Sequence, residues 1–223
     1  MMNISVIGAG YVGLITGIGF AKLNHQVSIV DLNDDLIKNL NENRPPFYEP
    51  ELVDYLNDSN IRNNLFFSTS YQKSINENTD IVFVCVQTPT DPDTGKTKTD
   101  YISSVLTELK KIESFNFIIC IKSTIKATLV EKISNEIDLD YKKIIFNPEF
   151  LREGSAFYDF FNPDRIVIGG SDQKGLNQCT ELYESFDCEK IITDSNSSQM
   201  IKYLSNTSVS YTHLTLPTNT VVG

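Results

Sequence analysis

The stretch NISVIGAGYVGLITGIGFAKLNHQVSIVDLN, residues 3–33, decides the fold of this chain. It begins with an apolar segment that predicts a strand, Ile4–Ile7, and continues into the glycine-rich turn GAGYVG at 8–13. A helical pattern then runs to about Asn24, and a second predicted strand covers Val27–Val30. A GxGxxG motif between a strand and a helix is typical of dinucleotide-binding proteins. The stretch therefore predicts a βαβ unit that binds a dinucleotide.

The three glycines of the turn have separate tasks in such a unit. Gly8 permits the tight turn, Gly10 lets a pyrophosphate approach the backbone, and Gly13 lets the helix pack close to its strand. The helix N-terminus, at Tyr11 and Val12, directs backbone amides and the positive end of its dipole toward the phosphates. We therefore expect all five residues to bind the cofactor.

A carboxylate stands at the end of the second predicted strand, at Asp31. At this position it can accept hydrogen bonds from the adenosine ribose, and it would repel a 2′-phosphate. The sequence therefore predicts NAD and not NADP as the cofactor. The alternative is that Asp31 only opens the loop Asp31–Asp34.

The composition is that of an ordinary globular protein, with 40% hydrophobic and 22% charged residues. The 223 residues can form one large domain, or one domain and a fragment. A net charge of −10 and the absence of a Lys/Arg cluster argue against nucleic acid as a partner. No apolar run reaches about 18 residues, and no basic leader precedes the first strand, so we expect no membrane partner.

The four cysteines lack the spacing of a metal site, so no metal is expected. Cys85 and Cys120 lie inside apolar segments that predict strands, whereas Cys179 and Cys188 come late in the chain. We interpret all four as reduced thiols of a cytoplasmic protein.

Predicted strands and helices alternate along the rest of the chain. This order predicts an α/β fold: a doubly wound, mainly parallel Rossmann-type sheet with helices on both faces. The further predicted strands are 65–68, 80–86, 116–121, 144–146, 165–169 and 190–192, and the further predicted helices are 36–41, 52–56, 71–76, 101–111, 126–136, 174–186 and one that begins near 199.

Polar residues follow three of the predicted strands at the point where each strand ends. Thr88 comes after the strand 80–86, Thr124 after 116–121, and Glu149 after 144–146. Ligands of such sheets bind beyond the carboxyl ends of the strands, so these loops gather at one rim, where we expect Thr88 and Thr124 to contact the cofactor. Taken singly, each threonine can be a plain strand-end residue. Glu149, like the Glu153 that follows it in NPEFLREGS, can equally belong to a solvated surface.

Several motifs together carry a family resemblance. GAGYVGL, FYEPEL, QTPTDPDTGK, KST, NPEFLREGSA and NPDRIVIG occur here in the order seen in the UDP-glucose/GDP-mannose dehydrogenase family. The chain resembles this family from Asn3 to about Thr207, and the UDP-glucose 6-dehydrogenases most. The resemblance implies an NAD-binding Rossmann-like domain over 1–196, the start of an interdomain linker helix over 197–207, and an irregular tail foreign to the family over 208–223.

The resemblance also implies a reaction. Enzymes of the family oxidise the C6 alcohol of a nucleotide sugar, here UDP-glucose, with two NAD molecules through a cysteine-bound thiohemiacetal and thioester. Thr124 and Glu149 would position the water or hydroxyl near C6. Glu153 would lie close to the nicotinamide and act as base for the hydrolytic water. The backbone of Phe150, Leu151 and Arg152, with both glutamates, would line the sugar site.

A second pair of catalytic residues is implied near the end of the resemblance. Lys202 and Asn206 are four residues apart and so share one helix face. In the family, such a lysine and asparagine on the helix that links two domains hold the C6 oxyanion and contact the substrate. The resemblance further implies that the full-length enzyme is a homodimer. Without the resemblance, Lys202 would be interpreted as a surface lysine.

Three departures from the family pattern limit the resemblance. The match stops near Thr207, and SVSYTHLTLPTNTVVG follows without helical periodicity. The family's catalytic cysteine belongs to the half that does not appear here. Leu36 stands where many relatives carry a lysine near the adenosine phosphate, although Lys38 is close. The alternatives are an NAD-binding module without catalysis, or a hydroxyacid-type dehydrogenase that makes a single two-electron oxidation.

Overall fold

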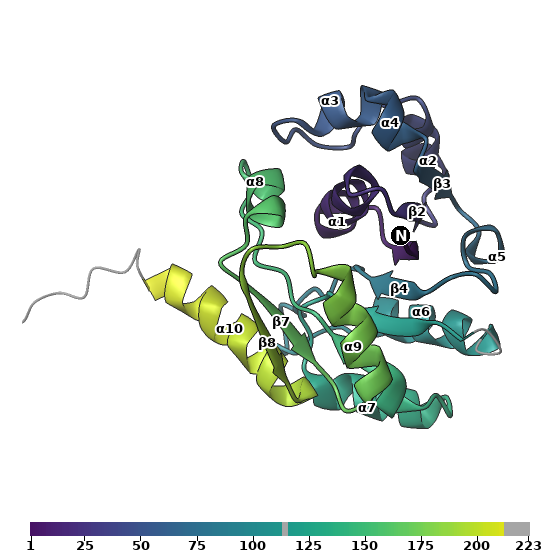
Figure 1. Cartoon of the computed structure of the whole chain (residues 1–223). Helices are drawn as coiled ribbons and strands as arrows, with labels where there is room; N and C mark the ends of the chain where they lie inside the picture. The colour runs from purple at the N-terminus through teal and green to yellow at the C-terminus, as the bar shows by residue number, and fades with distance from the viewer. Residues whose placement is uncertain (113–115, 212–223) are drawn as a thin grey trace, which may run out of the picture.

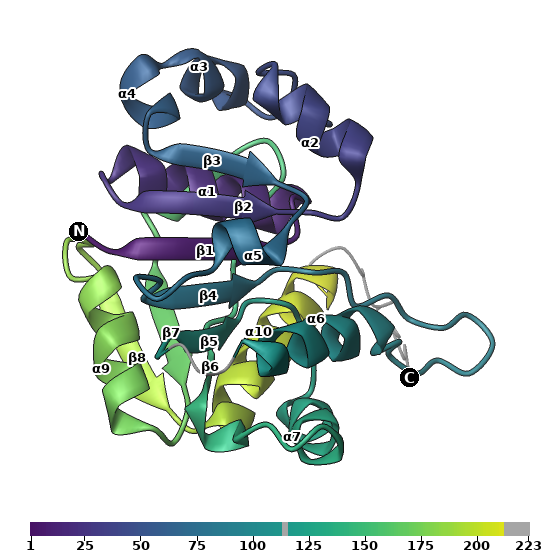
Figure 2. The ribbon, with the colours of Figure 1, turned by 90° about the vertical axis from the view of Figure 1, so that its right-hand side faces the viewer.

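The computed structural model describes residues 1–112 and 116–211, with side chains described as far as Thr207. Its centre is an eight-stranded sheet in the order β3-β2-β1-β4-β5-β6-β7-β8 (Figures 1 and 2). The strands are β1 (Asn3–Ile7), β2 (Gln26–Val30), β3 (Leu65–Ser68), β4 (Ile81–Val84), β5 (Ile118–Ile121), β6 (Ile144–Phe146), β7 (Arg165–Gly169) and β8 (Glu189–Thr193).

Most of the sheet is parallel. Every neighbouring pair from β3 to β6 is parallel, β7 is antiparallel to β6, and β8 is parallel to β7. The order β3-β2-β1-β4-β5-β6 is that of a doubly wound dinucleotide-binding sheet, so the predicted fold class is confirmed. The last two strands run in the opposite direction and extend one edge.

Helices cover both faces of the sheet. One hydrophobic cluster joins the sheet to side chains of α1, α2, α3, α8 and α9, and a second cluster joins its other face to α5, α6 and α7. The helices are α1 (Tyr11–Lys22), α2 (Asp34–Asn41), α3 (Leu52–Asn57), α4 (Ser59–Arg62), α5 (Tyr71–Ser74), α6 (Asp100–Lys111), α7 (Ala127–Glu136), α8 (Ala156–Phe161), α9 (Gln173–Leu182) and α10 (Ser195–Tyr211), with a 3-10 turn, η1, at Tyr141–Lys143.

The last helix, α10, runs along the edge of the sheet toward the rim. In Figure 1, α10 lies beside β7 and β8, and it contacts β6, β7 and α7. Because β8 runs against β1–β6, α10 begins at the opposite end of the sheet and returns along it toward the carboxyl ends of those six strands. Its later turns therefore reach the rim.

Two short helices and several boundaries differ from the sequence prediction: the predicted helix 174–186 ends at Leu182, and the predicted strand 80–86 is confined to Ile81–Val84. The helices α4 and α8 were not predicted, since each spans too few residues to show a helical period. The helix α10 begins at Ser195, not near 199, and continues to Tyr211, so residues 208–211 of the expected irregular tail are helical. The rest of that tail, residues 212–223, lies outside the described residues. Among the helices described, none is long and apolar enough to cross a membrane.

Candidate functional site

The glycine turn between β1 and α1 is shaped by close backbone contacts. Gly8 has φ +99°, and a Cβ there would lie 2.8 Å from the carbonyl oxygen of Cys85. A Cβ at Gly13 would lie 1.8 Å from the carbonyl oxygen of Gly8. A Cβ at Gly10 would meet no atom within 4 Å. The first and third glycines are therefore required by the fold itself, whereas Gly10 borders open space through which a ligand can reach the backbone.

The N-terminus of α1 has free donors at this open space. Gly10 is the N-cap and supplies no side chain, and the first turn of the helix holds no acidic residue. The first intrahelical bond runs from the amide of Leu14 to the carbonyl of Gly10, 2.9 Å. The amides of Tyr11, Val12 and Gly13 precede it and have no helical acceptor, which is the arrangement that binds a phosphate.

Asp31 lies beside this turn at the end of β2. Its Oδ2 accepts a hydrogen bond from the amide of Ala9 at 2.9 Å, and its Oδ1 accepts one from the amide of Asn33 at 3.0 Å. The carboxylate is thus fixed next to the fingerprint, where an adenosine ribose would approach. An open backbone at Gly10, unused helix amides and this carboxylate together fit a dinucleotide. That Asp31 selects NAD over NADP stays a prediction.

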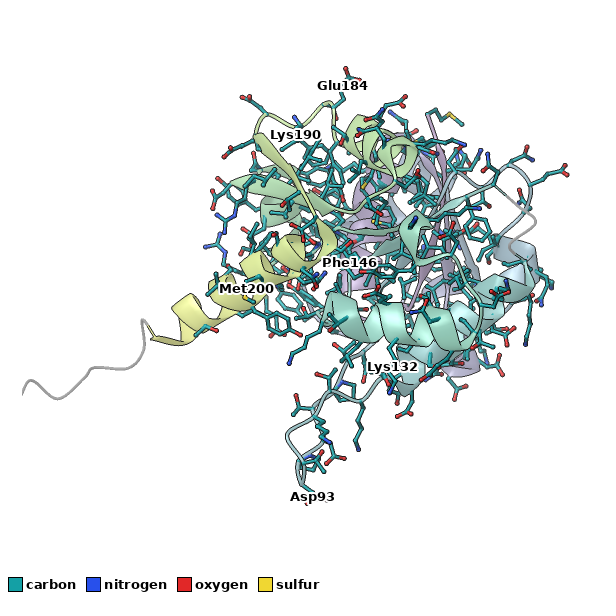
Figure 3. All side chains as sticks on the ribbon, turned by 90° about the horizontal axis from the view of Figure 1, so that it is seen from below. Asp93, Lys132, Phe146, Glu184, Lys190 and Met200 are labelled. Carbon is teal, nitrogen blue, oxygen red and sulfur yellow. The ribbon has the colours of Figure 1, made fainter. Side chains whose placement is uncertain are left out.

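The loops after β4 and β5 are joined at the rim. The Thr88 hydroxyl donates to the carbonyl of Thr124 at 2.9 Å, and the Ser123 hydroxyl donates to the carbonyl of Val86 at 2.6 Å. The structure therefore brings Thr88 and Thr124 together, as expected for neighbouring strand ends. The rest of the loop after β4 projects away from the sheet, with Asp93 at its tip (Figures 2 and 3).

The loop after β6 meets α10 through an ion pair. Lys202 Nζ donates to Glu149 Oε1 at 2.8 Å, with 6% and 15% of the two side chains exposed. The second oxygen of Glu149 accepts the amide of Leu151 at 2.7 Å. The ring of Phe150 lies below two cations, 5.3 Å from Lys202 Nζ and 5.1 Å from Arg165 Cζ. Residues from two distant segments thus form one charged, mostly buried group.

A cavity of about 650 Å³ opens around this group. It brings together most of the predicted substrate residues from the loop after β6 and from α10. Thr124 and Glu153 do not line it, and Glu153 is exposed. The predicted residues that line the cavity are Glu149, Phe150, Leu151, Arg152, Lys202 and Asn206.

Arg152 is tied to α8 within the same loop. Its amide, Nε and Nη2 donate to the Asp159 carboxylate at 2.8, 3.1 and 2.6 Å. Partial burial would raise the pKa of Asp159, but the hydrogen bonds from Arg152 outweigh it, so the pKa is lowered. Asp159 is therefore a carboxylate at neutral pH and holds Arg152 in place.

Two buried polar residues at the rim were missed by the sequence analysis. Lys122, at the end of β5, donates to Asn147 Oδ1 at 3.0 Å, and the Tyr183 hydroxyl donates to the same oxygen at 2.6 Å. Asn147 Nδ2 in turn donates to the carbonyl of Val167 at 2.9 Å. This network fixes the start of the NPEFLREGS loop. The signal for this network in the sequence is a lysine directly after an apolar strand.

Glu49 is a third missed residue, in the motif FYEPEL. Only 3% of it is exposed. It accepts hydrogen bonds from the Tyr11 hydroxyl at 3.0 Å, the Gly154 amide at 2.9 Å and the Ala156 amide at 2.8 Å. The motif contributes to the family resemblance, but nothing in the sequence indicates that a charged residue between prolines is buried.

The cysteines are free thiols that are wholly or partly buried. Cys85, Cys120 and Cys179 are buried and Cys188 is partly buried. Burial raises the pKa of Cys85 to about 12, and it raises the pKa of Cys120 as well. None of the four lines the cavity. Within residues 1–112 and 116–211, no group of His, Cys, Asp and Glu side chains is arranged to hold a metal ion.

Comparison with known proteins identifies the family. Residues 2–187 match the NAD-binding domain of the UDP-glucose/GDP-mannose dehydrogenase family. The chain is 36% identical to the UDP-glucose 6-dehydrogenase YwqF of Bacillus subtilis, over 92% of this chain and 47% of the relative. It is 35% identical to the UDP-glucose 6-dehydrogenase of Rhizobium meliloti, over 92% of this chain and 49% of the relative.

Solved structures give the same answer. A GDP-mannose dehydrogenase from Pseudomonas aeruginosa superposes with a TM-score of 0.87 at 27% identity, over 95% of this chain and 50% of the other. A UDP-glucose dehydrogenase from Pyrobaculum islandicum superposes with a TM-score of 0.85 at 33% identity, over 94% of this chain and 50% of the other. The chain spans about half the length of each of these four proteins. It belongs to the UDP-glucose/GDP-mannose dehydrogenase family, of which it is the NAD-binding domain.

Proposed function

We propose that this chain is the cofactor-binding half of an enzyme that oxidises the C6 alcohol of a nucleotide sugar, UDP-glucose, to the carboxylate. The observation that carries the proposal is the ion pair of Glu149 and Lys202 at the rim that also holds the NAD fingerprint. NAD, when bound there, supplies a hydride acceptor. Oxidation of an alcohol to an acid removes four electrons, so each sugar requires two NAD.

The residues of this chain would supply charge and position. Lys202, held by Glu149, lines the cavity, where its ammonium group would stabilise the oxyanion that develops on C6. Asn206 lies one turn further along α10 and lines the same cavity, so it would add a second donor. Glu149 and Thr124 would position the hydroxyl or water that reacts.

A thiol supplied from outside this chain would complete the chemistry. It would add to the aldehyde to give a thiohemiacetal, whose oxidation gives a thioester, and water would then release the acid and the thiol. Glu153 would take the proton of that water, at the exposed edge of the site where a second domain and NAD could enclose it. The four free cysteines accord with a reducing, cytoplasmic setting, and the full-length enzyme would act as a homodimer.

A fusion tests this function. Residues 1–207 are joined to the C-terminal half of the Bacillus subtilis relative, and NADH is counted per UDP-glucose consumed. We expect two NADH per sugar. One NADH per sugar would instead support a single two-electron oxidation of the hydroxyacid type.

For the chain on its own, the position of its cysteines favours a second candidate. Since none of them lines the cavity, the 223 residues alone would bind NAD without catalysis. Titration of the isolated chain with NAD, and with UDP-glucose present, distinguishes binding from turnover.

A further inference from the structure

Glu49 is a buried carboxylate held by neutral donors. It is 3% exposed, and it takes part in none of the ion pairs among the residues that the structure describes. A buried carboxylate is strongly unfavourable unless hydrogen bonds replace its lost water. Its three donors, Tyr11, Gly154 and Ala156, come from two segments more than a hundred residues apart in the chain. The loop that carries Glu49 therefore joins the fingerprint helix to the NPEFLREGS loop.

The same contacts surround one residue, Glu153. On its C-terminal side, the amide of Gly154 donates to Glu49 Oε2 at 2.9 Å. On its N-terminal side, the one hydrogen of the Tyr11 hydroxyl has two acceptors within reach, the carbonyl of Arg152 at 3.1 Å and Glu49 Oε2 at 3.0 Å, and it is shared between them. The Glu153 side chain itself is exposed, so the backbone on either side decides where it stands.

The Tyr11 hydroxyl stays a donor at physiological pH. Burial raises the pKa of Tyr11, and so do the hydrogen bond to Glu49 and the negative charges of Glu49 and Glu153. Tyr11 also packs on Phe47, with ring centroids 5.2 Å apart. Tyr11 is the first residue of α1, next to the amides that would bind the cofactor pyrophosphate. A hydrogen bond from its side chain therefore fixes its partner's position relative to those phosphates.

We propose that Glu49 is a positioning residue: with Tyr11 it clamps the peptide groups on both sides of Glu153, and so sets where that carboxylate stands relative to bound NAD. The inference rests on the proposed function, in which Glu153 lies close to the nicotinamide. It adds that the motif FYEPEL serves this placement through its glutamate.

The charge of the nicotinamide provides the readout. The ring is cationic in NAD⁺ and neutral in NADH, so a carboxylate beside it favours NAD⁺. We expect Glu153→Gln to raise the ratio of the NAD⁺ Kd to the NADH Kd by about three- to tenfold, the scale of one partly screened charge pair. Glu49→Gln, which keeps one acceptor oxygen and replaces the other by an NH₂ group, should shift the ratio in the same direction. The double variant should shift it no further than Glu153→Gln alone.

Amide hydrogen exchange tests the clamp directly. Glu49→Gln should speed exchange at the amides of Gly154 and Ala156 by about tenfold, because one neutral amide oxygen replaces the two carboxylate oxygens that accept from them. Tyr11→Phe removes only the hydroxyl and replaces Glu49→Gln in the test if that variant does not fold. It should raise the ratio of the NAD⁺ Kd to the NADH Kd by less than Glu49→Gln would. Glu51→Gln, at an exposed glutamate two residues away, is the matched control and should change neither readout.

The outcomes separate the two claims. If Glu153→Gln leaves the ratio unchanged, the proposed position of Glu153 is wrong, and the clamp has nothing to position. If Glu153→Gln shifts the ratio while Glu49→Gln weakens NAD⁺ and NADH equally, Glu49 is only structural and the inference is overturned. Unchanged exchange at residues 154 and 156 in folded Glu49→Gln would overturn it as well.

Discussion

Lys202 Nζ lies 2.8 Å from Glu149 Oε1, although the two residues are 53 positions apart in the chain. Glu149 follows β6, and Lys202 lies on α10, which returns to the rim only after β7 and β8 have reversed direction. The direction of the two edge strands, β7 and β8, which run against β1–β6, therefore has a consequence for the site. They start α10 at the far end of the sheet, so that its third turn delivers a cation to the carboxylate.

The pair predicts a measurable dependence of stability on both partners. Lys202→Met should lower the free energy of unfolding by about 2–4 kcal/mol, because it leaves Glu149 mostly buried without its cation. The double variant Glu149→Gln/Lys202→Met should recover part of that loss. Urea denaturation measures the free energy of unfolding of the single and the double variant. Lys132→Met, at a lysine that is 72% exposed in a surface ion pair, should change the free energy of unfolding by less than about 0.5 kcal/mol. Additive losses in the double variant would show that the pair is not coupled.

The part of the site that follows from local pattern was predictable from the sequence. The fingerprint, its flanking strands and Asp31 lie within a single βαβ unit, where hydrophobic period and glycine spacing fix the geometry. The strand ends that carry Thr88, Thr124 and Glu149 follow from the rule for parallel sheets.

The part that depends on long-range contacts was not predictable. The burial of Glu49 requires Gly154 and Ala156, which are 105 and 107 residues away. The direction of β7 depends on how the chain passes from β6 through α8, and a five-residue strand has no pattern that records its direction. The pairing of Arg152 with Asp159 is local, but it needs α8, which is too short to predict from periodicity.

The second and third glycines of the fingerprint, Gly10 and Gly13, should respond differently to the same substitution. Gly13→Ala places a methyl group 1.8 Å from the Gly8 carbonyl oxygen, so it should destabilise the fold by several kcal/mol, about 3 or more, and abolish NAD binding. Gly10→Ala meets open space, so the protein should fold with its thermal midpoint nearly unchanged and lose NAD affinity. Thermal unfolding and NAD titration measure the two effects. A Gly10→Ala variant that binds NAD normally would contradict the proposed approach of the phosphates.

The cofactor preference should depend on Asp31. We expect NAD to bind more tightly than NADP, because the carboxylate repels a 2′-phosphate at short range. Asp31→Asn should narrow the preference by about tenfold, the scale of one unfavourable charge contact. Titration calorimetry with both cofactors checks this, and Asp35→Asn, an exposed residue of α2, is the control. Equal binding of NAD and NADP by the unaltered chain would refute the role of Asp31.

Residues 208–223 should be dispensable for NAD binding. The fingerprint and Asp31 lie at the β1–β2 part of the sheet, whereas α10 packs on β6, β7 and α7. A chain that ends at Thr207 should therefore bind NAD with a Kd within about twofold of the longer chain. A larger loss of affinity would show that the end of the chain contributes to the cofactor site.

The catalytic prediction is that the 223-residue chain does not turn over UDP-glucose, whereas the fusion with the C-terminal half of a relative does. In the proposed mechanism the second hydride leaves from a thiohemiacetal carbon, which requires a thiolate at the sugar. Cys85 has its pKa raised to about 12 by burial, so its thiolate fraction at pH 8 is on the order of one part in ten thousand. Cys120 and Cys179 are fully buried, and Cys188, which is partly buried, does not line the cavity. Steady NADH formation by the isolated chain would refute this argument.

The fusion protein then separates the roles of Lys202 and Glu153. Lys202→Ala should lower kcat by about two to three orders of magnitude, the usual effect of losing an oxyanion stabiliser. Glu153→Gln should instead stall at the thioester, because the water that cleaves it has no base, and intact-mass spectrometry should detect the covalent adduct. Glu184→Gln, at an exposed residue after α9, is the control and should retain full turnover. Since Lys202 would act on the oxyanion and Glu153 on the water, only Glu153→Gln should accumulate adduct. Full activity in that variant would rule out Glu153 as the base.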